Sequence, residues 1–167
     1  MNEFQGEVFS VADLEKEARA TGGESLREQF EDVLAEFGET VKLPLALGED
    51  GTATFTVDDE IVVSLQYLDE SDFVVAFSPV GAFGGTGAPD AGEKALALLR
   101  MNEPGGIGEG FTLALDEEAD LVSAMDRRSA LEISSADSLA AWVDALVRVV
   151  RKVREDFAAR FPIGEEG

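Results

Sequence analysis

Carboxylates are the most abundant groups in this sequence that could do chemistry. The 167 residues include 35 Asp and Glu but no His and no Cys. These two absences exclude Ser-His-Asp and Cys-His nucleophile systems, zinc sites built on thiolate or imidazole, haem held by His, and redox dithiols. A carboxylate-dependent enzyme remains an alternative, but with so many acids any chosen pair is best explained as a solvated surface pair. We therefore predict a protein that is not an enzyme and needs no cofactor.

Two acidic clusters could be considered as cation ligands. They are residues 58–60, Asp-Asp-Glu, and residues 116–118, Asp-Glu-Glu. An EF-hand loop needs acids at alternate positions, a central Gly and a distal Glu, and neither cluster has that spacing. We expect both clusters to form hairpin turns and predict no metal site.

Two glycine-rich segments could be considered as phosphate loops. Residues 84–87 precede a predicted helix, but the first lysine that follows them is Lys94. Residues 105–110 precede a predicted strand and contain a glutamate of their own. A P-loop needs Gly-Lys-Ser/Thr at the start of its helix, and a dinucleotide site needs a strand-loop-helix unit. Both segments are therefore interpreted as connectors.

Apolar side chains near the N-terminal third could bind a polypeptide. Ser25 and Glu28 form a capping-box pattern at the start of an amphipathic helix, and Gly38 is predicted to end it. Residues 41–47 follow as an extended segment, and Pro44 favours a connector or edge segment over a central strand. This apolar material could be core, or it could form a groove for an extended or helical peptide. The predicted groove consists of Phe30, Val33, Leu34, Phe37, Leu43, Leu45 and Leu47.

The remaining elements follow from hydrophobic periodicity. The third strand is expected to alternate through Phe73, Val75 and Phe77, and the last helix to start near Ser135 or Ser138 and to cover one face of the sheet. The order indicates an α+β fold with an antiparallel five-stranded sheet, α-β-β-β-α-β-β-α. The predicted strands are residues 52–57, 61–68, 73–78, 111–115 and 121–125, with a second helix at residues 90–101.

One domain accounts for residues 25–162. Residues 1–24 are predicted to be an N-terminal extension that could hold a short helix, and residues 163–167 an acidic tail. The run at residues 95–99 of the second helix is apolar nearly all round. A short helix in a small domain has one face for its own core, so we expect the other face to meet a second copy of the chain.

The net charge of −22 limits the possible partners. Nucleic acid needs a cationic surface and would be repelled by most of this one. A basic run from Arg148 to Arg154 is better explained by the second half of a helix, where cations complement the helix dipole. No stretch approaches the roughly 18–20 apolar residues needed to span a membrane, and no signal peptide or cysteine framework indicates export. We predict a cytoplasmic protein without nucleic-acid partners or membrane insertion.

Two segments resemble a known family. Residues 43–65, LPLALGEDGTATFTVDDEIVVSL, are similar to the signature of class I type III secretion chaperones of the CesT/Tir-chaperone type. In that family a leucine-rich connector and an acidic turn lead into the first strand, and an acidic pair leads into the second. Residues 102–113, NEPGGIGEGFTL, are similar to the family's Asn- and Gly-rich entry to the fourth strand.

The resemblance implies a bacterial cytoplasmic homodimer that binds the N-terminal region of an exported effector. The effector would stay soluble, non-globular and competent for secretion, with no nucleotide consumed. A same-fold dimeric regulatory or peptide-binding module outside secretion remains the alternative. The dimer interface that the resemblance implies consists of Ala95, Leu98, Leu99, Phe111 and Leu113.

Overall fold

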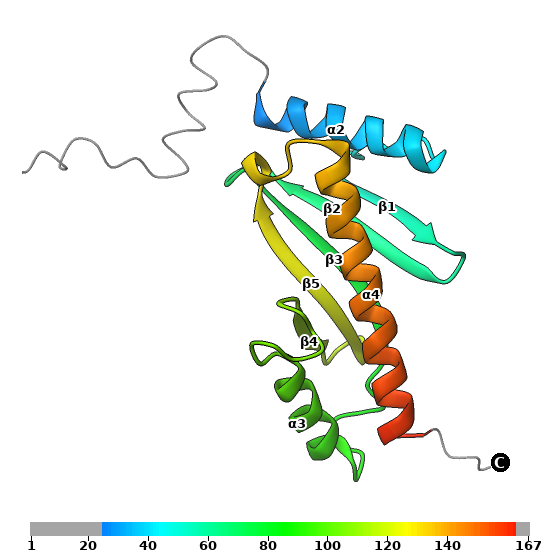
Figure 1. The fold of residues 1–167 in the computed structure, drawn as a ribbon. Coiled ribbons are helices and arrows are strands. Elements are labelled where there is room, and N and C mark those ends of the chain that lie inside the picture. Colours follow the sequence, from blue (N-terminus) through cyan, green and yellow to red (C-terminus); the bar gives the residue numbers. More distant parts are fainter. Residues whose placement is uncertain (1–24, 163–167) are drawn as a thin grey trace, which may run out of the picture.

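The structure, a computed structural model, describes residues 25–162, and their helices and strands follow the predicted order (Figure 1). The predictions for residues 1–24 and 163–167 lie outside the described residues. The elements in chain order are α2 (Leu26–Val41), β1 (Thr52–Val57), β2 (Ile61–Leu68), β3 (Phe73–Ala82), α3 (Ala91–Met101), β4 (Thr112–Asp116), β5 (Leu121–Ser129), the 3-10 helix η2 (Ala130–Glu132) and α4 (Ala136–Arg160).

The strands form one antiparallel five-stranded sheet in the order β1-β2-β3-β5-β4, which confirms the predicted fold class. The acidic turn between β1 and β2 explains one of the clusters noted in the sequence. Asp58 and Asp59 both have positive φ, 53° and 58°, and the Glu60 amide donates to the Val57 carbonyl at 3.0 Å. Two positive φ values are typical of the type I′ turn that joins tight hairpins. After α3, β4 forms the outer strand and β5 returns between β4 and β3.

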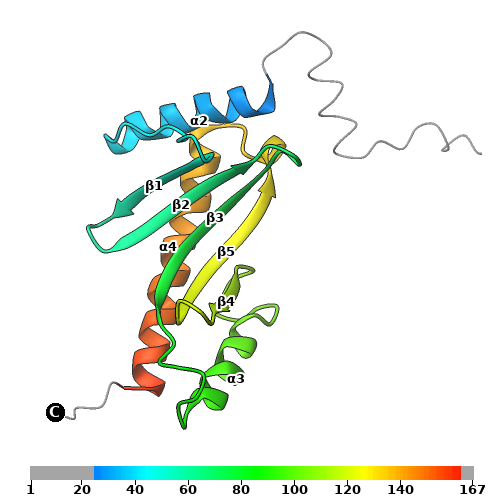
Figure 2. The same ribbon diagram turned by 180° about the vertical axis from the view of Figure 1, so that it is seen from behind.

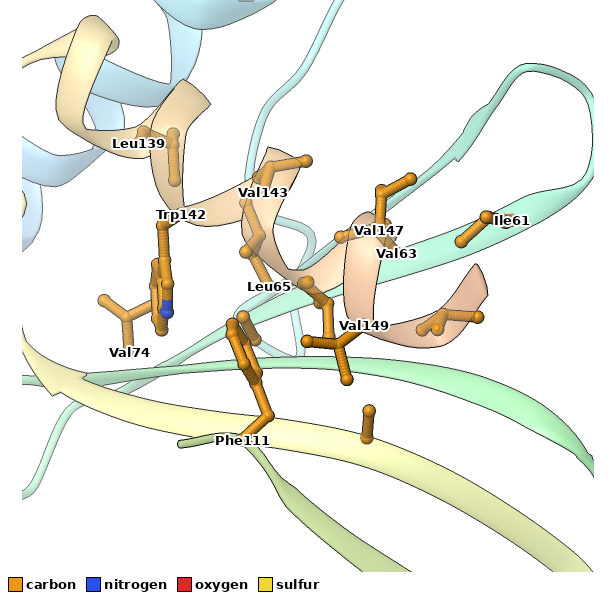
Figure 3. Packing of buried hydrophobic residues seen from close by; sticks show 14 of the residues in the cluster. Ile61, Val63, Leu65, Val74, Phe111, Leu139, Trp142, Val143, Val147 and Val149 are labelled. Carbon is orange, nitrogen blue, oxygen red and sulfur yellow. The ribbon is translucent and has the colours of Figure 1, made fainter. Parts of the chain in front are cut away.

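Helix α4 packs across one face of this sheet, with buried residues from Leu139 to Val153, and its last turns extend past the ends of β3 and β5 (Figures 1 and 2). Its start confirms the prediction, because the Ser135 and Ser138 side chains each accept from the other residue's backbone amide. The stripe beginning at Leu139 is buried against the strands, and Figure 3 shows Trp142 above Val74 of β3. The Trp142 indole donates to the Asp126 carboxylate at 2.9 Å, which satisfies the only polar atom of that side chain.

Helix α2 does not end at Gly38, contrary to the prediction. It continues to Val41, and Lys42 takes the left-handed conformation after it, with φ of 62°. Gly38 instead allows the segment that follows α2 to fold back and pack closely against the helix. A Cβ atom there would lie 2.5 Å from the Leu43 carbonyl oxygen, and the Leu43 amide donates to the Gly38 carbonyl at 2.8 Å.

Strand β3 is longer than predicted and turns the other set of side chains toward α4. Val74 and Ala76 are fully buried, whereas Phe73, Val75 and Phe77 are only half-buried on the opposite face. The register explains this choice, because each residue of the buried set lies opposite a buried residue of β2. Alternating residues identify two faces of a strand, but both faces of β3 are apolar, so the pattern alone does not say which is inside.

Candidate polypeptide-binding surfaces

Most of the predicted groove on α2 belongs to the core. Phe30, Leu34 and Phe37 are 1%, 0% and 4% exposed. The Phe30 ring lies 5.7 Å from the ring of Tyr67 on β2, and Phe37 meets Phe55 of β1 edge-on at 5.9 Å. These side chains hold α2 against the sheet, so a partner cannot reach them while the helix stays in place. Of the predicted groove residues, the structure therefore leaves Val33, Leu43, Leu45 and Leu47 at least partly accessible.

The accessible apolar residues lie at and beyond the end of α2. Val41 and Leu43 are 40% and 38% exposed, and Leu45 and Leu47 are half-buried. We call these four residues the connector strip. Its backbone belongs to no strand, as Pro44 predicted, and the Leu45 amide donates to the Leu43 carbonyl at 3.0 Å across that proline. Val33, half-buried on α2, is the one helix residue of the predicted groove that keeps partial access to solvent.

The outer edge of β1 is a second feature of this end of the sheet. The Gly48 amide donates to the Thr52 carbonyl at 3.0 Å, so the connector covers the first residue of the strand. Thr54 and Thr56 point their backbone groups to the same side, and these groups have no strand partner among residues 25–162. An edge of this kind can accept an added strand.

Helix α3 carries the other exposed apolar surface. Leu96 and Leu99 are 48% and 66% exposed, and the neighbouring Ala95 is also exposed. Leu96 was not among the predicted interface residues, although the apolar run that contains it was the signal that predicted self-association. We call Ala95, Leu96 and Leu99 the α3 face.

The other predicted interface residues are core residues of each chain. Leu98, Phe111 and Leu113 are 6%, 5% and 5% exposed. Leu98 belongs to the hydrophobic core, whereas Leu99, about 100° further round α3, is exposed. Of the five predicted interface residues, the structure thus leaves only Ala95 and Leu99 accessible to a partner.

The outer edge of β4 differs from the edge of β1, because a side chain already occupies it. The Asn102 amide donates to the Leu113 carbonyl at 3.2 Å, and its oxygen accepts from the Leu113 amide at 2.8 Å. This pair of bonds imitates a neighbouring strand. It also attaches the end of α3 to the sheet, which gives the Asn and Gly-rich segment a structural role.

The loop before β4 is attached to α4 through Glu109. Its carboxylate accepts from Arg148 at 3.0 Å and from Lys152 at 2.5 Å. Hydrogen bonds from Arg148 and then Lys152 lower the pKa of Glu109 from 4.5 to about 2, and the same pairing raises the pKa of Arg148. Arg151 pairs with Asp58 of the β1–β2 turn. Three of the four basic residues of this run, Arg148, Arg151 and Lys152, are therefore paired with carboxylates of their own chain.

Within residues 25–162, no three His, Cys, Asp or Glu side chains come close enough together to hold a metal ion. No helix of that part of the chain is both long and apolar enough to cross a membrane.

Comparison with known proteins then identifies the family. The sequence model of the Tir chaperone protein (CesT) family matches residues 32–154, well over half of the chain. This chain belongs to the Tir chaperone family. The predicted resemblance is thereby confirmed, and the chain's class of function is that of an effector-binding chaperone of type III secretion. A comparison with curated protein sequences gave no match.

Solved structures of the same fold agree with the family assignment. The chain is similar to the HopA1–SchA chaperone–effector complex, with a TM-score of 0.62, 19% identity, and coverage of 77% of this chain and 95% of the other. For the ExsC–ExsE complex the TM-score is 0.64 at 20% identity, covering 79% and 96%. For the type III secretion chaperone SycH of Yersinia pestis with a fragment of YscM2, it is 0.55 at 25% identity, covering 74% and 98%.

Proposed function

We propose that this Tir chaperone family member binds the N-terminal region of an exported effector and keeps it soluble, non-globular and competent for secretion. The observation that carries the proposal is the family match over residues 32–154. Two of the similar structures are complexes of such chaperones with their effector or a partner fragment, which supports a polypeptide as the partner. The proposed activity is binding alone, without a catalytic step or a cofactor, in the bacterial cytoplasm.

The connector strip and the edge of β1 are the proposed place of contact. Val41 and Leu43 offer exposed apolar area, and the neighbouring strand offers backbone groups at Thr54 and Thr56 that have no strand partner within residues 25–162. An extended segment could hydrogen-bond to that edge and place alternate apolar side chains on the strip. Backbone bonds would give affinity for many sequences, and the strip would favour segments with apolar residues at the right spacing.

The α3 face is the proposed contact between two copies of the chain. A two-fold interface uses the same patch on both subunits, so Leu96 and Leu99 of one copy would pack against the same helix of the other. Exposed leucines on a chain with a net charge of −22 are best covered by an apolar surface, since most of the remaining surface is acidic.

The effector proposal is tested by isolating the tagged chain from its own bacterium under conditions of secretion. Limited proteolysis and mass spectrometry of the captured complex should find a protected segment near the N-terminus of a secreted protein, and that segment should lack a folded core. In the variant with Val41→Asp and Leu43→Asp, binding is expected to fall at least tenfold, because two exposed apolar contacts are replaced by charges.

The matched control is Leu131→Asp on η2, which is similarly exposed at 39% and is expected to bind normally. A captured partner that is fully folded would contradict the proposal and favour a regulatory module. Equal binding by the strip variant and the control would contradict the proposed place of contact.

A further inference from the structure

A cavity of about 570 Å³ lies at the end of the molecule opposite to α2. The last turns of α4, the end of β3, the beginning of β5 and the first turn of α3 surround it. This volume is large enough for one or two bulky side chains. The apolar residues that line it are Val80, Phe83, Val122, Phe157, Phe161 and Pro162.

Arg154 is one of two cations in the wall of this cavity. Its guanidinium donates to the Val80 carbonyl at 2.9 Å and to the Pro79 carbonyl at 3.3 Å, at the place where the β3–β5 register shifts. These acceptors are neutral, and Arg154 forms no ion pair with any carboxylate in the described part of the chain. Within residues 25–162, its charge is thus left without a counter-ion beside an apolar cavity.

Lys94 is the second cation. Its ammonium group donates to the Phe83 carbonyl at 2.9 Å, and the side chain is only 14% exposed. Asp90 lies 3.4 Å away and is more exposed, at 43%. Two partly buried cations next to apolar walls fit an apolar side chain that has a carboxylate close by, because the carboxylate would form charge-assisted hydrogen bonds with them.

The chain itself contains a segment of this chemistry outside the described residues. Residues 1–10 contain Phe4 and Phe9, each within two residues of a glutamate, Glu3 and Glu7, and no basic residue. Residues 9–25, fully extended, span up to about 55 Å. The 25 residues of α4 that separate the α2 end from the cavity span about 38 Å, so the segment can reach it.

We propose that residues 4–9 of the chain occupy this cavity, with an aromatic side chain between the apolar walls and a neighbouring glutamate facing Arg154 and Lys94. A tethered segment acts at an effective concentration in the millimolar range, which favours it over a free ligand of equal intrinsic affinity. The N-terminal extension would thus cover apolar surface of its own chain. This inference goes beyond effector binding and does not depend on it.

The absence of cysteine allows a direct test by disulfide trapping in the full chain. The test variant carries Ser10→Cys and Ala158→Cys, because Ala158 is exposed and lines the cavity. Its control carries Ser10→Cys and Ala141→Cys, at an exposed position in the N-terminal half of α4. An N-terminal segment that moves freely would reach Ala141 at least as fast as Ala158, since Ala141 lies nearer to the tether point at Ser25.

We expect the intrachain disulfide to Ala158 to form at least tenfold faster than the one to Ala141. Phe4→Ala with Phe9→Ala should remove that preference, and Arg154→Gln with Lys94→Gln should reduce it severalfold while thermal unfolding confirms that the variants are folded. Equal rates at the two positions would overturn the proposal. A disulfide that joins two chains would also overturn it and would point to a second copy as the occupant. Neither result bears on the effector proposal, because no effector is present in the test.

Discussion

Helices α2 and α3 are both amphipathic, yet they use their apolar residues in opposite ways. The richer face, with Phe30 and Phe37 on α2, is covered by β1 and β2 and is almost inaccessible. The smaller aliphatic face of α3 leaves Leu96 and Leu99 exposed, because α3 packs at the outer strand β4 and has nothing on its other side within residues 25–162. Apolar content alone therefore does not identify a binding surface. The elements that pack against a helix decide which of its apolar residues are core and which are accessible.

The largest expected effect tests the buried side of this comparison. Phe30→Ala should lower the free energy of unfolding by about 3–5 kcal/mol, because it leaves a cavity between α2 and the sheet. Urea denaturation followed through the fluorescence of Trp142 measures the change. Leu99→Ala, at a concentration where the chain is monomeric, should lower it by less than about 0.5 kcal/mol. Similar losses for both variants would mean that the two helices are not packed differently.

The exposed side of the comparison is tested through association. Leu96→Asp with Leu99→Asp should weaken dimer formation at least about 100-fold, because each leucine buried at a two-fold contact contributes on both subunits. Light scattering should then report a mass near the 17.8 kDa of one chain. The Leu131→Asp control should keep the mass of the unchanged protein. A double variant that remains dimeric would exclude the α3 face as the interface.

Two glycines, one in each helix, offer a matched pair with a smaller effect. Gly38→Ala should lower the free energy of unfolding by about 1–3 kcal/mol, because its Cβ would press on the Leu43 backbone. Gly92→Ala should raise it by about 0.5–1 kcal/mol, since a Cβ there meets nothing within 4 Å and alanine favours helix. Denaturation gives the energies, and hydrogen exchange of residues 43–47 should increase only in the first variant. Stabilisation by both substitutions would contradict the close packing of the connector against Gly38.

The smallest expected effect concerns the attachment of the β4 loop by Glu109. Its pKa in the folded protein is about 2, below the ordinary 4.5, so the stabilisation is complete above about pH 4.5 and is lost as the pH falls toward 2. Glu109→Gln should therefore lower the melting temperature slightly at neutral pH, by less than half as much near pH 3, and hardly at all near pH 2. The difference should also shrink in high salt, because the pair is solvent-accessible. A difference that grows on acidification would contradict this assignment.

Much of the architecture could be predicted because local chemistry and tertiary structure agree. The reciprocal caps at Ser25 and Ser135 start their helices, and the turn at Asp58 and Asp59 joins its strands. The site was less predictable. Phe30 and Leu43 were assigned to one groove, but the first is core and the second is accessible. Periodicity describes one element at a time and contains no information about what covers it.

The sequence by itself determined the family, the order of the elements and the excluded chemistries. These follow from short-range patterns and from residue types that are present or absent, and neither depends on the folded contacts. Only the tertiary structure decided which face of β3 is inside, that Gly38 is a packing position, and that Leu96 is exposed while Leu98 is not. The physical reason is the same in each case. Burial results from contact between segments that are distant in the sequence, such as β2 beside β3 or the connector against α2. A change in strand register or in packing angle would therefore exchange the buried and the exposed side chains.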